Sequence, residues 1–255
     1  MKNPFFDRGF FRLGAMCIML IPVFGDAQQE PSHWSYSGEE GPNKWGKLDS
    51  TYAACSNGKT QSPVDIRGAR KADLPALKFD YQVVPLNIID NGHTIQVNYP
   101  AGSTLTVGKK IYALKQFHFH HPSEEHVNGQ GYDMVAHLVH TDAEGHLAVV
   151  AVFLKKGNAN ALIGSLWQNL PTERGKAVDV SKVALNAKDL LPDDSGYYTF
   201  AGSLTTPPCS EGVTWYVMKN PLTLSDAQVA AFARLYPENA RPIQPLNDRE
   251  ILETK

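Results

Sequence analysis

The sequence predicts a mainly β protein in which one sheet dominates a single domain. Short runs with strand-like alternation follow one another along the chain, and turns rich in Gly, Asn and Pro separate them. Helical patterns are few and short, and there is no repeat, linker or low-complexity segment. The 255 residues, 42% of them hydrophobic, suffice for one globular domain with a sizeable core.

The first element is a hairpin at 87–97, where Asn91-Gly92 is a turn signal between two strand-like runs. We expect His93 to begin the second strand and to share a face with Ile95 and Val97. Further strands are predicted at 103–107, 112–121, 134–140, 147–154, 197–200 and 213–218. Helices are predicted at 159–169 and from the capping sequence at Ser225 to about 235.

The N-terminal 27 residues have the pattern of a secretory signal peptide. Three basic residues precede a largely apolar run at 13–24, and small residues precede a predicted cut after Ala27. A retained membrane anchor is the weaker alternative, because the run is shorter than the roughly 20 residues of a spanning helix and Pro22 interrupts it. We therefore expect residues 28–255 to form the mature domain, with no stable membrane span.

Charge and cysteine content restrict the environment and partners of the mature chain. A formal net charge of −2 with scattered charges argues against nucleic-acid binding. Cleavage removes Cys17 and leaves Cys55 and Cys209, an even pair that predicts one disulfide in an exported protein; two unpaired buried thiols are the alternative. The periplasm of a Gram-negative bacterium is the expected location, with secretion as the alternative, and a homodimer is left open.

Three histidines form a pattern with chemical meaning. His118 and His120 would point to one face of a strand, and His137 from a neighbouring strand could complete a facial set. Three imidazoles with one open position describe a catalytic zinc site, whereas a structural site is normally closed by four ligands. The alternative is a set of strand histidines satisfied by hydrogen bonds. The remaining candidates are expected to be structural or solvated: His121, His126, His140 and His146.

The histidine pattern and several other motifs together resemble the α-class carbonic anhydrases. The supporting segments run in family order over nearly all of the mature chain: Tyr36 in 33–36, Gln61-Ser62-Pro63-Val64-Asp65-Ile66, Asn91-Gly92-His93, the three histidines, 202–208 and 241–245. The resemblance implies a large, twisted, mostly antiparallel sheet with short peripheral helices. It also implies reversible hydration of carbon dioxide to bicarbonate and a proton by hydroxide formed at zinc.

Roles around the metal follow from the same resemblance. Gln116 corresponds to the hydrogen-bond acceptor of the first zinc ligand. The family's acceptor for the third ligand is a Glu two residues before it, and here that residue is Val135, so His137 must find another partner. Thr205 corresponds to the threonine that orients the hydroxide and donates its proton to a buried Glu. Glu124 is the predicted acceptor, with its neighbour at 125 as the alternative.

The resemblance also implies a substrate wall and a route for the proton. Thr206 is expected at the bicarbonate site. The residues expected to form the apolar wall for carbon dioxide, whose alternative role is core packing, are Val139, Val149, Leu204, Val213 and Trp215. His93 corresponds to the proton shuttle, and an exposed hairpin histidine without a role is its alternative. Waters on the path would be ordered by Tyr36, Asn91 and Gln96.

Two other classes of function compete with a zinc lyase. A catalytically silent relative would use the same fold as a binding module, but such relatives typically lack zinc histidines, and this chain keeps all three. An exported zinc scavenger would instead carry exposed His-rich tracts. The sequence therefore favours an enzyme with carbon dioxide and bicarbonate as its small-molecule partners.

Overall fold

The computed structural model describes residues 33–255. The predicted signal peptide at 1–27, with its cut after Ala27, lies outside the described residues. Among residues 33–255, no helix has both the length and the apolar character needed to cross a membrane.

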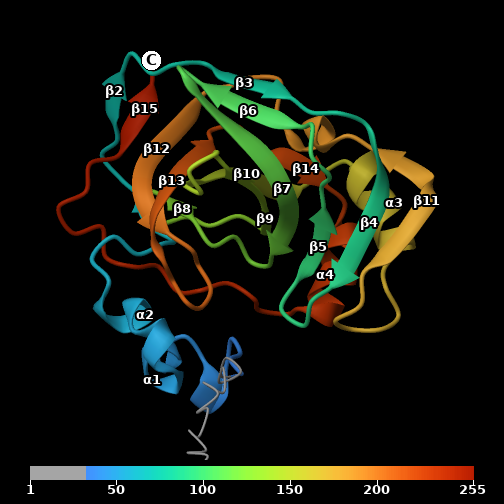
Figure 1. Cartoon of the computed structure of the whole chain (residues 1–255), viewed down its shortest axis with the longest axis horizontal. Helices are drawn as coiled ribbons and strands as arrows, with labels where there is room; N and C mark the ends of the chain where they lie inside the picture. Colours follow the sequence, from blue (N-terminus) through green and yellow to red (C-terminus); the bar gives the residue numbers. More distant parts are fainter. Residues whose placement is uncertain (1–32) are drawn as a thin grey trace, which may run out of the picture. The chain divides into compact units, whose positions relative to one another are not determined.

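Strands account for most of the regular structure (Figure 1). In chain order they are β1 (Asp65–Ile66), β2 (Arg70–Ala72), β3 (Leu77–Asp80), β4 (Val84–Asp90), β5 (Ile95–Asn98), β6 (Thr104–Val107), β7 (Lys110–His120), β8 (His126–Val127), β9 (Met134–Thr141), β10 (Leu147–Lys156), β11 (Val178–Leu185), β12 (Tyr197–Ser203), β13 (Glu211–Met218), β14 (Leu222–Leu224) and β15 (Leu252–Thr254). The helices are α1 (Trp45–Leu48), α2 (Ala54–Asn57), α3 (Ala161–Gln168) and α4 (Asp226–Leu235), with short 3-10 turns at Gly38–Glu40, Ser50–Tyr52 and Ala187–Leu190.

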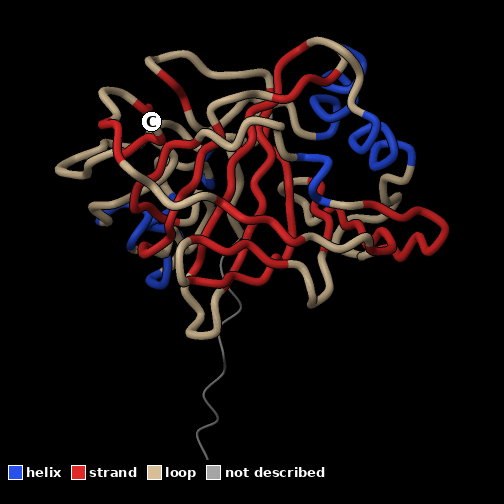
Figure 2. The backbone as a smooth tube through the Cα atoms, turned by 90° about the horizontal axis from the view of Figure 1, so that it is seen from above, coloured by secondary structure: helices blue, strands red, loops and turns tan. Residues whose placement is uncertain are grey.

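Within the described residues, thirteen strands form one sheet with the main order β11-β4-β5-β7-β9-β10-β13-β12-β15-β2. Most neighbours are antiparallel, and the parallel pairs are β10 with β13, β10 with β14, and β15 with β2. A separate parallel pair joins β1 to β8. Seen from above, strands run through the centre and helices lie toward the margins (Figure 2). The predicted fold class, a large and mostly antiparallel sheet with few short helices, is confirmed.

The central strands are buried on both faces of the sheet. Consecutive residues of β9 belong to different clusters: Ala136 to the one that contains Ile88 and Leu138, and Val135 to the one that contains Val149 and Trp215. A strand covered on both sides needs apolar residues at nearly every position, which explains the continuous apolar run of β10. The polar residues that do occur on these central strands therefore require a specific partner or function.

The two longer helices begin at the predicted places. Asn160 caps α3 by accepting the backbone N–H of Ile163. Ser225 and Gln228 form a reciprocal capping box at the start of α4. Both helices contribute buried side chains to the larger apolar cluster, so they cover one face of the sheet and leave the other face for the histidines.

The prediction for His93 was wrong in its local structure. The antiparallel pairing of β4 with β5 ends at Asp90 and Ile95, and His93 lies in the turn between the two strands. The Asn91 side chain is the reason, because its Oδ1 accepts the backbone N–H groups of both His93 and Thr94 and so removes them from the ladder. His93 consequently does not share the buried face of Ile95.

Candidate metal centre

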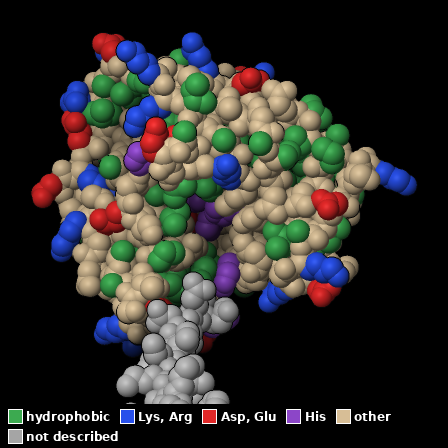
Figure 3. Space-filling view, viewed as in Figure 1, with side chains coloured by type: hydrophobic (Ala, Val, Ile, Leu, Met, Phe, Trp, Pro, Cys, Tyr) green, Lys and Arg blue, Asp and Glu red, His purple; other side chains and the backbone are tan. Residues whose placement is uncertain are grey.

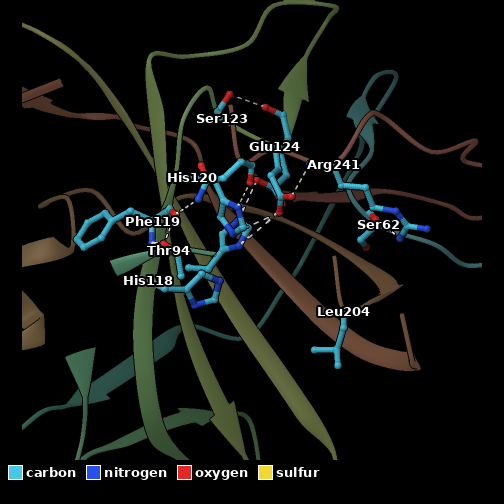
Figure 4. Close-up of polar contacts among 12 residues, drawn as sticks. Ser62, Thr94, His118, Phe119, His120, Ser123, Glu124, Leu204 and Arg241 are labelled. Atoms are coloured by element: carbon cyan, nitrogen blue, oxygen red, sulfur yellow. Dashed lines mark hydrogen bonds and ion pairs between the residues drawn. The ribbon is translucent and has the colours of Figure 1, made fainter. Parts of the chain in front are cut away.

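His118, His120 and His137 meet on one face of the sheet. The first two are alternate residues of β7, and the register of the antiparallel β7–β9 pair places His137 directly opposite His118. Their ring centroids are 4.7–5.5 Å apart, and one nitrogen from each ring lies within 4.8 Å of the others. Figure 4 shows the two β7 histidines together with the buried Glu124. The predicted facial set is therefore present in the fold.

Hydrogen bonds to the outer nitrogens determine which nitrogen of each β7 ring is free. His118 Nδ1 lies 2.8 Å from Oε1 of Gln116, as predicted. His120 Nδ1 lies 2.7 Å from the backbone oxygen of Asn239. A carbonyl oxygen can only accept, so both rings carry their proton on Nδ1 and leave a lone pair on Nε2. His120 Nε2 is buried with no hydrogen-bond partner among residues 33–255, as expected for a nitrogen that binds a metal.

His137 presents the opposite nitrogen. Its Nε2 lies 3.1 Å from Oε2 of Glu125, which leaves Nδ1 for the shared site. Val135, two residues earlier on the same strand face, is fully buried and apolar. The sequence indicated that His137 needs a partner other than residue 135, and the structure places Glu125 in hydrogen-bonding position.

The histidines are held in the neutral form that metal ligation requires. Burial lowers the pKa of His118 well below its ordinary value. It lowers the pKa of His120 to about 4, although Glu124 opposes the shift, and that of His137 to about 3. The three rings therefore remain uncharged at neutral pH and offer three nitrogen donors with no negative charge of their own.

Glu124 lies beside the histidines at the base of the site. Its Oε1 accepts the backbone N–H of Arg241 at 2.8 Å, and its Oε2 is 3.5 Å from His120 Nε2 (Figure 4). Burial raises its pKa to about 7, while hydrogen bonds from Arg241 and Thr205 act in the opposite direction. Of the two adjacent glutamates, Glu124 thus contacts Thr205, the arrangement expected for the threonine's proton acceptor.

The apolar residues expected at the substrate wall belong to one cluster on the histidine face. Its fully buried members include Val149, Val213 and Trp215, and Val139 and Leu204 pack against them. The Trp215 ring meets His137 edge to face, with ring centroids 4.9 Å apart. The cluster therefore provides an apolar surface immediately beside the third histidine.

A pocket of about 120 Å³ leads to the histidines, and Figure 3 shows histidine side chains in a hollow on this face. Its lining includes His93 and the three predicted proton-path residues, Tyr36, Asn91 and Gln96. The other lining residues are Trp34, Thr94, Gln116, His118, His120 and Thr206. The His93 ring stacks on Trp34 with centroids 3.7 Å apart and planes at 7°. Burial lowers the pKa of His93, and the nearby His33 and Arg174 add to the shift.

Sequence reasoning missed Asn239, which no local pattern marked. Its backbone oxygen binds the His120 ring, and its side-chain amide donates to the backbone oxygens of His93 and Phe119. Its Oδ1 accepts the backbone N–H of His121. One buried residue thus connects the turn that carries His93 to the end of β7, a connection that only the tertiary contact reveals.

Buried polar contacts also stabilise the layer next to the pocket. The predicted disulfide joins Cys55 to Cys209, with Cα atoms 5.0 Å apart. Arg241 donates to the backbone oxygens of Cys55 and Ser62 and to the Gln61 side chain. Its guanidinium therefore links the segment around Cys55, one partner of this disulfide, to the Gln61-Ser62-Pro63 motif.

Together, the mostly antiparallel sheet and the three inward-facing histidines match the fold and site of the carbonic anhydrases. The family described as eukaryotic-type carbonic anhydrase matches residues 40–255. A carbonic anhydrase of Neisseria gonorrhoeae is 44% identical over 98% of this chain and 100% of its own length.

Two solved structures give the same result. A hyperthermostable carbonic anhydrase from an active hydrothermal vent chimney superposes with a TM-score of 0.85 and 47% identity, covering 88% of this chain and 100% of that chain. The α-carbonic anhydrase of Thermovibrio ammonificans, in complex with the inhibitor sulfanilamide, gives 0.83 and 42%, covering 87% and 99%. The chain belongs to the α-class, or eukaryotic-type, carbonic anhydrase family, and it is a lyase of that type.

Proposed function

We propose that the protein catalyses the reversible hydration of carbon dioxide with a zinc ion held by His118, His120 and His137. The observation that carries the proposal is the convergence of three neutral ring nitrogens within 4.8 Å, each ring having its other nitrogen engaged by an outer acceptor. Such a set of three imidazoles suits zinc and leaves a position open for chemistry. Bound there, zinc would make a water molecule acidic enough to ionise near neutral pH.

Thr205 and Glu124 would orient the attacking oxygen. If the Thr205 hydroxyl donates its proton to the Glu124 carboxylate, only its lone pairs face the site, and it would accept the remaining proton of the attacking oxygen. The accepted proton turns a lone pair of that oxygen toward the substrate carbon. The backbone N–H of Arg241 supports this role by holding Glu124 in place.

Carbon dioxide would rest against the apolar cluster beside His137. The molecule is neutral and has no leaving group, so its site has to exclude competing water and offer no charge. Leu204 and Val139 are partly exposed and pack against the cluster, whose buried members include Val149 and Trp215. Thr206 lines the pocket and would contact the polar bicarbonate product.

His93 would carry the product proton from the pocket to solvent. Its ring is half-buried at the pocket wall and stacked on Trp34, and its lowered pKa favours release of an accepted proton. Tyr36, Asn91 and Gln96 line the same pocket and can order the intervening waters.

The test is stopped-flow carbon dioxide hydration by the purified protein before and after removal of metal with a chelator, and again after zinc is restored. We expect fast hydration that disappears and returns with zinc. His93→Ala should lower the maximal turnover, and imidazole buffer should restore it. A folded, zinc-loaded protein that does not hydrate carbon dioxide would refute the proposal.

We also propose that the protein is exported to the periplasm. The Cys55–Cys209 disulfide supports export, because such bonds persist in oxidising compartments. Recovery of mature chain beginning at residue 28 in a periplasmic extract would support this location, and full-length chain in the cytoplasm would contradict it.

A further inference from the structure

Glu125 is a buried carboxylate that the proposed reaction does not use. Its side chain is 0% exposed, and it lies next to the equally buried Glu124. Its Oε1 has no hydrogen-bond partner among residues 33–255, and its Oε2 lies 3.1 Å from Nε2 of His137. Burying a carboxylate is strongly unfavourable unless it is paired. Two adjacent buried acids would therefore be unfavourable unless each had a positive or hydrogen-bonding counterpart.

The segment that carries Glu125 is anchored independently of β9. Ser123 Oγ donates to the backbone oxygen of Glu125 and accepts the backbone N–H of Tyr132. On the other side, the backbone N–H of His126 donates to the oxygen of Val64. These contacts hold the Glu125 backbone between two neighbours, so its carboxylate approaches His137 from a fixed direction.

The strand that carries His137 supplies no acceptor of its own. Side chains two residues apart share a strand face, so Val135 and Val139, both apolar, are the β9 neighbours on the same side. Val135 has no polar side-chain atom and is fully buried in the apolar cluster. An N–H at His137 Nε2 directed into that cluster would lack a partner without Glu125, and an unpaired buried donor destabilises the fold.

We propose that Glu125 is the positioning residue of the third zinc ligand. Its carboxylate accepts the Nε2 proton of His137, and Nδ1 thereby points toward the nitrogens of His118 and His120. The arrangement moves the supporting carboxylate from the ligand's own strand, where Val135 stands, to the loop after β7. The inference rests on the proposed zinc function and adds a determinant of zinc affinity to it.

Electrostatics gives the buried acid a reason to be there. Burial disfavours the negative form of this carboxyl and raises the pKa of Glu125 to about 8, and the neutral rings of the three histidines do not offset its charge. A divalent cation at their convergent nitrogens would offset the negative charge through the polarised imidazole. A carboxylate partner also raises the basicity of the ligating ring, and loss of such a partner typically weakens metal affinity about 10- to 100-fold.

The test measures the zinc dissociation constant of Glu125→Gln by competition with a chromophoric chelator. Gln keeps the size of the side chain but removes the negative charge. We expect affinity to fall about 10- to 100-fold and the visible spectrum of the cobalt-substituted protein to change. Glu173→Gln, an exposed residue paired with Lys176, is the matched control and should bind zinc like the parent.

A second variant tests whether the position of the carboxylate matters. Val135→Glu in the Glu125→Gln background returns an acid to the strand face of His137, and we expect it to recover most of the lost zinc affinity. A purely structural role for Glu125 predicts otherwise: lower stability of the metal-free protein with parental zinc affinity. Parental affinity in a folded Glu125→Gln protein would overturn the proposal.

A further test uses the parent protein and therefore does not depend on whether a variant folds. Nitrogen-15 histidine spectra of the zinc-loaded protein should show His137 protonated at Nε2, and His118 and His120 protonated at Nδ1. A proton on Nδ1 of His137 would overturn the inference. If the parent neither binds zinc nor hydrates carbon dioxide, the proposed function fails; if it does both and Glu125→Gln binds zinc equally well, only the role of Glu125 fails.

Discussion

His140 makes stability depend on pH, and the effect can be worked out from its burial. The residue lies on β9, on the face opposite His137, with 0% exposure. Its Nε2 is 2.7 Å from the hydroxyl of Tyr81, and its Nδ1 has no partner among residues 33–255. Burial lowers the pKa of His140 to about 4, and weaker effects of the neighbouring backbone oppose the shift. A charged imidazole is therefore strongly disfavoured in the folded protein.

The direction of the pH effect on stability follows from comparing proton binding by the folded and unfolded chains. The pKa of an unfolded histidine is about 6.5, so between pH 6.5 and pH 4 the unfolded chain binds more protons at His140 than the folded one. The contribution to stability is complete above pH 6.5 and is lost as the pH falls toward 4. Each unit of difference between the folded and unfolded pKa values corresponds to about 1.4 kcal/mol. Lowering the pH from 7.5 to 5 should therefore reduce the free energy of unfolding by about 2 kcal/mol through this residue.

The assay is urea unfolding of the metal-free parent and of His140→Gln at pH 7.5 and pH 5. Gln can keep a hydrogen bond to Tyr81 but cannot titrate. We expect the variant to lose about 2 kcal/mol less than the parent between the two pH values. His146→Gln, in which the exposed ring contacts Asp142, is the control and should retain the parental pH dependence. Equal losses for His140→Gln and the parent would refute the reasoning.

Two further predictions concern groups around the metal centre. Thr205→Val keeps the shape of the side chain but removes the hydroxyl that contacts Glu124, so carbon dioxide hydration should slow roughly 100-fold in stopped-flow assays while zinc affinity stays unchanged; an unchanged rate would contradict the orienting role. Asn239→Leu should lower the free energy of unfolding by about 2–6 kcal/mol, because the backbone oxygen of His93 and the backbone N–H of His121 each lose a buried partner. The His120 contact is made by the Asn239 backbone and should survive, so we expect zinc binding to be preserved. Urea unfolding measures the loss of stability, and a loss below about 1 kcal/mol would contradict the role given to the two backbone contacts.

Local periodicity explains why two of the candidate metal ligands could be predicted from the sequence. Alternation along a strand places His118 and His120 on one face regardless of what surrounds them. The position of His137 opposite His118 depends on the pairing register, which includes an irregularity between Leu114 and Gln116. Resemblance to the family identified His137 as the third ligand, and the pairing register of β7 with β9 places it beside His118.

The turn at His93 shows how local polar chemistry overrides a strand pattern. Apolar alternation at Ile95 and Val97 extends naturally back to 93, which favoured a strand. The Asn91 side chain competes for the backbone N–H groups, and no periodicity of apolar residues reports that competition. The placement of His93 at the pocket wall therefore followed from the turn and not from the strand.

The fold class, the shared face of His118 and His120, the disulfide partners and the absence of an acceptor at Val135 can be predicted from the chain, because each depends on residue identity, local spacing or a count. The contacts of Glu125 with His137 and of Asn239 with the His120 ring become visible only in the folded protein. These contacts join residues from separate loops, and hydrogen bonds require a few tenths of an ångström of positional accuracy. That accuracy arises from the packing of the whole sheet, and no local pattern in the chain encodes it.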